Sequence, residues 1–355
     1  MLTANEILEW DMDGIPVAVP PLLTVNHLVK HFPVRPGLFG RPSAHVRAVD
    51  GLSFGVQEGE TLGIVGESGC GKSTVARLLM HLLSADSGTI EFGGSRVGSY
   101  GLPMKSFRAQ VQMVFQDSYA SLNPRLTIES SIAFGPTVHG ISWSEAIARA
   151  RALLDRVGLE PKRFAGRYPH ELSGGQRQRV NIARALALQP KVLILDEAVS
   201  ALDKSVEAQV LNLLLDLKDE FGLTYIFISH DLEVVRFMAN RVMVMYLGKV
   251  AEIGKTEAVY GAARQPYTLA LLAPMLWMDP DRRSTQAPLT GDPPNPIDPP
   301  PGCRFHTRCA HASDICRSKV PALLGSDPGH QTACHLVDAA SGALAFRSEA
   351  RVAAP

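Results

Sequence analysis

A glycine-rich stretch at residues 66–74, with the sequence Gly-Glu-Ser-Gly-Cys-Gly-Lys-Ser-Thr, constrains this chain more than any other feature. It follows an apolar run at residues 61–65 and precedes a helical pattern at 75–83. Glycines let the backbone curl so that successive N–H groups point inward, and the positive end of the following helix adds to their attraction for an anion. The stretch therefore predicts a strand, a phosphate-binding loop and a helix, in that order.

Two side chains of this loop suit particular tasks on a nucleotide. Lys72 is expected to reach the β- and γ-phosphates, and Ser73 to supply a hydroxyl to Mg²⁺. The other candidate nucleotide-binding residues of the loop are Gly66, Ser68, Gly69, Cys70, Gly71 and Thr74. Because Cys70 lies at a helix N-terminus, we expect its thiolate to be favoured and its alkylation to block the nucleotide, although a position without a redox role is the simpler interpretation.

A second apolar run, at residues 192–195, ends in the carboxylates Asp196 and Glu197. Such a run is typical of a central strand in a parallel sheet, and ligand sites lie at the carboxyl ends of these strands. Behind a phosphate-binding loop, the pattern predicts that Asp196 holds Mg²⁺, directly or through water, and that Glu197 polarises an attacking water.

The pentapeptide Leu-Ser-Gly-Gly-Gln at residues 172–176 indicates a second anion site. Ser173 can cap the helix that follows, and Gly174 and Gly175 expose N–H groups at its start. Gln176 completes the motif, which precedes the carboxylate strand by about one helix. An ordinary capped helix start is the alternative interpretation.

The 355 residues exceed what one small domain needs. Strand and helix patterns alternate up to residue 265, which predicts an α/β fold with a mostly parallel sheet and helices on both faces. We expect an irregular tail at 1–21, a nucleotide-binding domain at 22–265 and a small C-terminal module at 266–355. A stiff, proline-rich stretch at 287–302 would lead into the cysteines of that module.

Composition excludes some classes of partner. Lys plus Arg and Asp plus Glu are 35 each, so the formal net charge is zero and a nucleic-acid surface has no support. No apolar run approaches the roughly 18–20 residues that span a bilayer, and the first residues lack a signal-peptide core. We expect a cytoplasmic protein whose membrane role, if it has one, comes through a partner.

These motifs, followed by Ser-Ala-Leu-Asp at 200–203 and a strand pattern ending at His230, resemble the nucleotide-binding subunit of ABC transporters over residues 22–265. The resemblance implies a P-loop NTPase fold with ATP and Mg²⁺, an antiparallel β subdomain and an inserted α-helical subdomain at about 117–180. It also implies that Gln116 senses Mg²⁺ and the membrane partner, that His230 contacts the γ-phosphate, and that Asp203 belongs to a loop crossing a dimer. Phe32 is the candidate that stacks on adenine, with Phe39 and His45 as competitors.

In this family, two subunits pack head to tail, so Ser173 and Gly175 of one chain would face the γ-phosphate held by the other. ATP would then join the pair and hydrolysis would release it. Lys204 departs from the family pattern, because relatives usually carry a small apolar residue after Leu202-Asp203.

Several segments resemble the oligopeptide/dipeptide importer branch, and most closely the second of its two paired ATPases. They lie at residues 31–34, 37–40, 115–117, 121–125, 302–309 and 333–336. The implied partners are a paralogous ATPase, two membrane permeases and an extracytoplasmic peptide-binding protein, with the loop at 116–136 docking on the permease at the cytoplasmic face of the membrane. Importers of nickel chelates or glutathione are the alternatives, and a soluble ABC ATPase of translation or DNA repair is a third.

Four of the five cysteines, Cys303, Cys309, Cys316 and Cys334, lie in the last sixth of the chain. Four thiolates suit a tetrahedral Zn²⁺ or a [4Fe–4S] cluster. The spacing lacks the Cys-x2-Cys pairs of zinc ribbons, and family members can carry an iron–sulfur cluster here, so we expect the cluster. Nearby histidines keep zinc open, and four reduced buried thiols are the remaining alternative.

Overall fold

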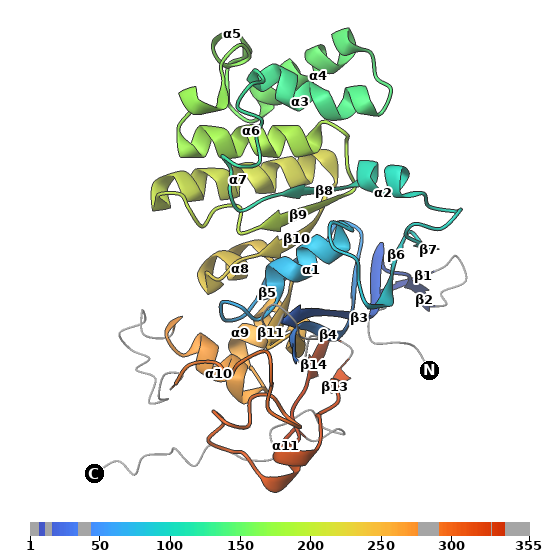
Figure 1. Cartoon of the computed structure of the whole chain (residues 1–355), viewed down its shortest axis with the longest axis vertical. Helices are drawn as coiled ribbons and strands as arrows, with labels where there is room; N and C mark the ends of the chain where they lie inside the picture. Colours follow the sequence, from blue (N-terminus) through green and yellow to red (C-terminus); the bar gives the residue numbers. More distant parts are fainter. Residues whose placement is uncertain (1–6, 11–15, 35–43, 276–290, 328, 338–355) are drawn as a thin grey trace, which may run out of the picture.

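The computed structural model describes residues 7–10, 16–34, 44–275, 291–327 and 329–337. Figure 1 shows a central sheet with a layer of helices at one end of the long axis and the C-terminal residues at the other. None of the described helices is both long enough and apolar enough to cross a membrane.

An eight-stranded sheet forms the centre of the molecule. Its order is β13-β14-β12-β11-β5-β10-β9-β8, and the pairs from β11 to β8 are parallel. The strands are β5 (Thr61–Val65), β8 (Val111–Val114), β9 (Val192–Asp196), β10 (Thr224–Ile228), β11 (Arg241–Tyr246), β12 (Lys249–Lys255), β13 (Leu324–Asp327) and β14 (His330–Thr332). The predicted mostly parallel sheet is confirmed.

Both faces of this sheet are covered, which explains why its strands read as continuous apolar runs. In β9, Val192 and Ile194 face a core shared with α1 (Lys72–Leu79) and α2 (Met104–Gln110). Leu193 and Leu195 face the opposite core, which includes α6 (Gly174–Leu186), α7 (Lys204–Phe221) and α8 (Leu232–Met238). This alternation is the two-residue period of a strand.

A four-stranded antiparallel sheet lies beside the central one, in the order β4-β3-β6-β7. It consists of β3 (Leu23–Val34), β4 (Ala44–Val56), β6 (Ser87–Phe92) and β7 (Ser95–Arg96). The antiparallel subdomain that the family resemblance implied is therefore present.

A helical layer occupies the end of the molecule drawn in green in Figure 1. It contains α3 (Ile128–Val138), α4 (Trp143–Arg156), the short α5 (Pro161–Phe164), the 3-10 turn Pro169–Glu171 and α6. Thr127 and Ser142 cap α3 and α4 by accepting hydrogen bonds from backbone N–H groups. The loop predicted at 116–136 ends earlier than expected, because the Thr127 cap starts helix α3 at Ile128.

The C-terminal residues do not form a separate layer. After α9 (Thr256–Gly261) and α10 (Pro266–Leu272), β14 pairs with β12 and extends the central sheet, while α11 (Asp314–Ser318) lies beyond it. Three aromatic rings, from Tyr246, Tyr267 and Phe305, contact one another and join this region to the sheet. Part of the predicted proline-rich stretch, residues 287–290, lies outside the described residues.

The expectation of an irregular segment at 1–21 is wrong for two short runs. β1 (Ile7–Trp10) and β2 (Pro16–Val19) pair with each other as an antiparallel ladder, because each apolar run supplies the other with hydrogen-bond partners.

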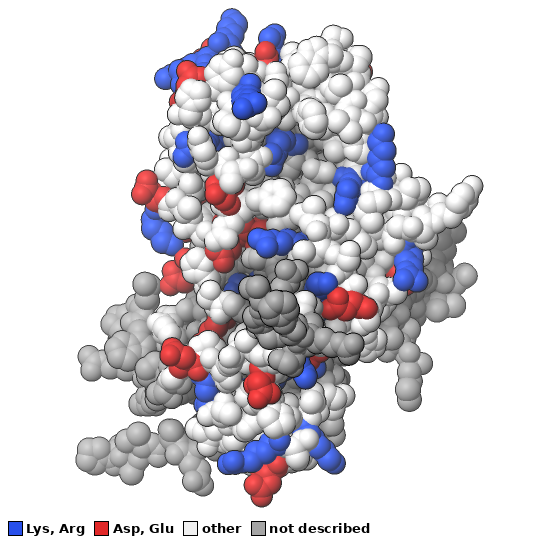
Figure 2. Space-filling view, viewed as in Figure 1, with Lys and Arg blue, Asp and Glu red and all other residues white. Residues whose placement is uncertain are grey.

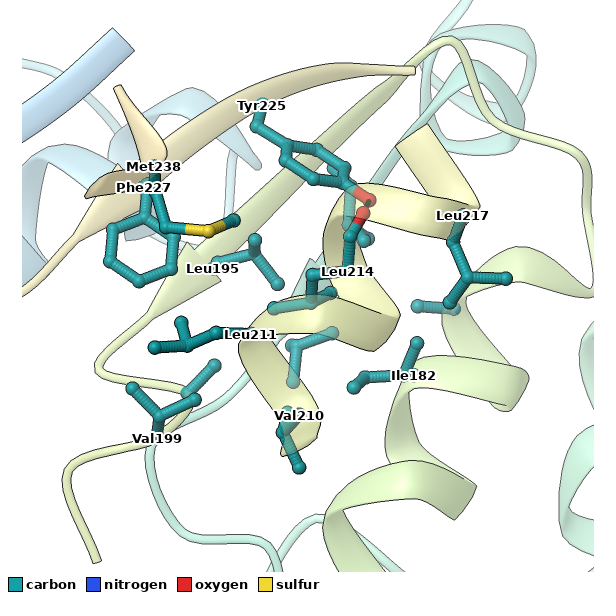
Figure 3. Close-up of a cluster of buried hydrophobic side chains, with 14 of the residues drawn as sticks. Ile182, Leu195, Val199, Val210, Leu211, Leu214, Leu217, Tyr225, Phe227 and Met238 are labelled. Carbon is teal, nitrogen blue, oxygen red and sulfur yellow. Dashed lines mark hydrogen bonds between the residues drawn. The ribbon is translucent and has the colours of Figure 1, made fainter. Parts of the chain in front are cut away.

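The core between α7, α6 and the sheet sets the position of strands β9 and β10 (Figure 3). Leu214 is fully buried there, and the Tyr225 hydroxyl donates to the Leu214 carbonyl oxygen at 2.8 Å. Leu214→Ala would leave a cavity, so we expect the free energy of unfolding to fall by about 2–5 kcal/mol. Asn212→Ala, at an exposed position of the same helix, should change it by less than about 0.5 kcal/mol. Denaturant melts of both variants check this, and equal losses would contradict it.

Candidate functional site

The strands β5, β9 and β10 end at the same edge of the central sheet, and a cleft lies there. In the parallel register, Ile228 of β10 pairs with Ile64 on one side and Asp196 on the other. The cleft has a volume of about 680 Å³. Its lining includes Phe32, Val46, Ala48, Ser68, Gly69, Gly71, Lys72, Ser73, Thr74, Gln116, Glu197 and His230. Ten of these are residues that the sequence analysis named, and Val46 and Ala48 are additions.

The loop at 66–74 has the tight backbone that its glycines predict. Gly71 has φ +108°, and a Cβ there would lie 2.1 Å from the Ala48 carbonyl oxygen. Only glycine fits this position without moving β4. Lys72 is buried, and its ammonium donates to the carbonyl oxygens of Gly66 at 2.7 Å and Glu67 at 3.1 Å. The cation thus lies against the loop itself, inside the cleft.

Ser73 and Asp196 meet in a geometry that fits Mg²⁺. The Ser73 hydroxyl donates to Asp196 Oδ1 at 2.9 Å, which places two oxygen ligands side by side. Burial raises the pKa of Asp196 and the neighbouring Glu197 adds to the rise, whereas the Ser73 hydrogen bond lowers it. A divalent cation would offset the desolvation that burial imposes on this carboxylate.

Glu197 lies beside the two other candidates for catalysis. Its Oε2 accepts a hydrogen bond from Gln116 Nε2 at 2.8 Å and lies 3.5 Å from His230 Nδ1. The Glu197 backbone has φ +48° and its N–H donates to the Ile228 carbonyl oxygen at 2.9 Å. A left-handed glutamate is strained, and such strain clusters at functional sites. Here it turns the carboxylate out of the strand and into the cleft.

Of the three candidates for stacking on adenine, Phe32 lines the cleft. It lies on β3 opposite Val46, with the Lys30 ammonium 5.6 Å from its ring centroid. His45 is described and is not among the residues that line the cleft. Phe39 lies outside the described residues.

The pentapeptide at 172–176 forms the capped helix start that its residues predict. Ser173 Oγ accepts from the Gln176 N–H at 3.3 Å, and Gln176 Oε1 accepts from the Ser173 N–H at 3.0 Å. Gly174 follows Ser173 as the first residue of α6. A Cβ on Gly175 would lie 2.4 Å from Val206 Cγ1, so a glycine is needed where α6 meets α7. None of these residues lines the cleft of their own chain.

Asp203 occupies the N-cap position of α7 without a capping hydrogen bond from its side chain, and Lys204 is the first residue of the helix. The Lys204 ammonium donates to Glu207 at 3.0 Å and to Asp231 at 2.9 Å. Asp231 follows His230 directly. Lys204, which departs from the family pattern, therefore connects the loop before α7 to the loop after β10. The Lys204 side chain, which is common to both ion pairs, is 76% exposed, and pairs with an exposed partner contribute little to stability.

The expected thiolate character of Cys70 is wrong. The side chain is 3% exposed, and burial raises the pKa of its thiol despite the Lys72 charge nearby. The position of Cys70 at a helix N-terminus predicted a lowered pKa, but that argument leaves out the desolvation of the buried thiol.

The four C-terminal cysteines lie close to one another, but the structure does not arrange them as metal ligands. Burial, with smaller contributions from the charges of the other three, raises the pKa of Cys334 to about 11. Among the residues that the structure describes, no group of three or more His, Cys, Asp or Glu side chains has an arrangement that could hold a metal ion. The expected metal centre is therefore not supported by the structure.

Family models match two parts of the chain. The model described as ABC transporter matches residues 49–200, which include the loop, the pentapeptide and the carboxylate strand. The model described as oligopeptide/dipeptide transporter, C-terminal region, matches residues 251–316.

Relatives align with most of the chain. The chain is 49% identical to the oligopeptide transport ATP-binding protein AppF of Bacillus subtilis over 89% of this chain and 97% of that protein. It is 46% identical to the di/tripeptide transport ATP-binding protein DppF of Pseudomonas aeruginosa, over 88% of this chain and 97% of that one.

Two solved structures also resemble this chain in fold. CbiO1 of Clostridium perfringens, part of the ABC transporter complex CbiONQ, has a TM-score of 0.60 at 27% identity, covering 74% of this chain and 97% of its own. The ATP-binding cassette MJ0796, as a post-hydrolysis dimer with ADP and phosphate, has a TM-score of 0.57 at 29% identity over 66% of this chain and 98% of its own. With the cleft described above, these similarities show that the chain belongs to the ABC transporter family of ATPases.

Proposed function

We propose that this chain binds and hydrolyses ATP to energise an ABC importer of di- or oligopeptides. The observation that carries the proposal is the meeting of Lys72, the Ser73–Asp196 pair and Glu197 in one cleft at the strand ends. The names of AppF and DppF, and the match of residues 251–316 to a peptide-transporter region, support peptides as the solute.

Each side chain has a task in phosphoryl transfer. Lys72 and the loop N–H groups would bind the β- and γ-phosphates, and Ser73 and Asp196 would hold Mg²⁺, which would neutralise charge on the same phosphates. Glu197 accepts a hydrogen bond from the attacking water and polarises it. Gln116 and His230 flank that carboxylate at 2.8 and 3.5 Å, where they orient the water and contact the γ-phosphate.

A second subunit completes the site in this proposal. Ser173 is exposed at the N-terminus of α6 and does not line its own cleft, so its free surface suits the γ-phosphate held by a partner. Asp203, at the start of α7, would cross the same interface. The partner is a paralogous ATPase, as the paired subunits of peptide importers suggest.

Exposed apolar side chains support docking on a membrane permease. Tyr119, Phe134, Val138 and Trp143 are each at least half exposed. Tyr119 lies in the loop before α3, Phe134 and Val138 lie in α3, and Trp143 begins α4. Exposed apolar residues in one region mark interaction sites. The chain would thus be held peripherally at the cytoplasmic face of the membrane by two permeases, served by an extracytoplasmic peptide-binding protein.

The alternatives are less well supported. Nickel chelates or glutathione would need relatives named for them, whereas the relatives above are named for peptides. A protein that binds nucleic acid usually has a basic surface. Figure 2 shows Lys and Arg interspersed with Asp and Glu on the visible face.

Glu197→Gln tests the role of the proposed base. The amide keeps an oxygen that can accept from Gln116, so we expect ATP to bind as in the wild type while phosphate release falls at least about 100-fold. We also expect ATP to trap the closed dimer. Glu233→Gln, at an exposed carboxylate of α8, is the matched control and should change neither. Wild-type turnover in Glu197→Gln would remove Glu197 from this role.

We also propose a [4Fe–4S] cluster at Cys303, Cys309, Cys316 and Cys334, with Zn²⁺ as the alternative. The closeness of the four thiols supports it, although they would have to rearrange to hold a metal. Anaerobic purification should yield about four iron and four acid-labile sulfide per chain, lost in Cys309→Ser. A content of one zinc per chain would show that the four thiolates bind Zn²⁺ and no cluster. A folded chain without metal would show that they are reduced thiols.

A further inference from the structure

One loop of the C-terminal region, residues 303–309, contacts two segments that adjoin the cleft. Arg308 contacts the phosphate-binding loop, and Arg304 contacts the strand and turn beside it. Both arginine side chains are 7% exposed. Neither emerged from the sequence analysis as a functional residue.

Arg308 forms a two-pronged ion pair with Glu67, the second residue of the loop. Its Nη1 lies 2.8 Å from Glu67 Oε2, and its Nη2 lies 3.1 Å from Oε1. The planar guanidinium matches the carboxylate in this geometry, which is the strongest form of such a pair. Its Nη1 also approaches the Tyr246 hydroxyl at 3.4 Å.

Glu67 is held through its backbone as well. Its N–H donates to the Tyr267 hydroxyl at 2.9 Å, and its carbonyl oxygen accepts from the Lys72 ammonium at 3.1 Å. Arg308, Glu67 and Lys72 therefore form one chain of contacts, from the C-terminal region to the cation that meets the phosphates.

Arg304 supports the same loop from the other side. Its guanidinium donates to the Leu247 carbonyl oxygen and to Asp50. The next residue of that turn, Gly248, donates its N–H to the Cys70 carbonyl oxygen at 2.9 Å. Burial raises the pKa of Asp50, but the net shift is downward because Arg304 and Lys249 lower it. The Asp50 carboxylate therefore stays ionised in this network.

We propose that Arg308 is a positioning residue for ATP: by holding Glu67 it keeps the phosphate-binding loop and Lys72 in the form that binds phosphate. Arg304 fixes the adjoining turn for the same purpose. The inference rests on the proposed function, in which this loop binds ATP. It assigns the C-terminal region a part in nucleotide affinity.

The test is the ATP affinity of the full chain carrying Arg308→Gln. We expect the Kd for Mg-ATP to rise about tenfold, and KM to rise with it while kcat at saturating ATP stays within about twofold of wild type. Arg308→Lys keeps the charge without the fork and should recover part of the affinity. Arg317→Gln, at an exposed position of α11, is the matched control and should leave Kd unchanged.

A double-mutant cycle with Glu67→Gln assigns the effect to the pair. The two substitutions together should weaken ATP binding no more than either one alone. A purely structural role would lower thermal stability without this coupling in Kd. Wild-type Kd in Arg308→Gln, or additive effects in the double variant, would overturn the proposal.

Two further outcomes are also decisive. If Arg308→Gln does not fold, Glu67→Gln removes the same pair without touching the C-terminal region, and its Kd then decides. A folded wild-type chain without ATP affinity would overturn the proposed function itself, which is a different result from variants that bind ATP as the wild type does.

Discussion

The parallel pairing of β5, β10 and β9 sets the level at which each strand ends, and the site depends on that level. The hydrogen-bond register aligns Ile64, Ile228 and Asp196 across three strands. Whatever follows each strand, whether the phosphate-binding loop, Glu197 or His230, must then emerge at the same edge. The two buried cores on either face prevent a shift of register, since a slip of one residue would turn every apolar side chain the wrong way.

The charged groups of this cleft are held in place by hydrogen bonds within the chain. Lys72 lies against carbonyl oxygens of its own loop, and Asp196 accepts a hydrogen bond from Ser73 in a position where burial opposes its ionisation. A divalent cation would relieve the cost of burying the Asp196 carboxylate, and a nucleotide phosphate would give Lys72 an anionic partner. Electrostatic preorganisation of this kind is commonly the largest contribution to catalysis.

Local patterns predicted most of the fold and the cleft. The central strands and the helices at 143–156 and 204–221 follow from their periodicity, and the phosphate-binding loop from its glycines. The helix at 128–138 was missed because turn residues precede it and Pro136 lies within it. The state of Cys70 depended on burial, which a motif does not report. The role of Arg308 could not be predicted for another reason. Its partner Glu67 is 241 residues away, and a single arginine in a loop belongs to no periodic sequence pattern.

The pairing of β14 with β12 bears on how the chain folds during synthesis. Residues 330–332 complete an edge of the central sheet, and residues 304 and 308 reach back to positions 50 and 67. Contacts of such long sequence separation form late, because a large loop must close before they stabilise anything. On the ribosome, the phosphate-binding loop emerges early, whereas its partner Arg308 is 241 residues further along the chain and emerges much later. A nascent chain that stops short of this arginine would carry every nucleotide motif and an open sheet edge, which is a template for aggregation.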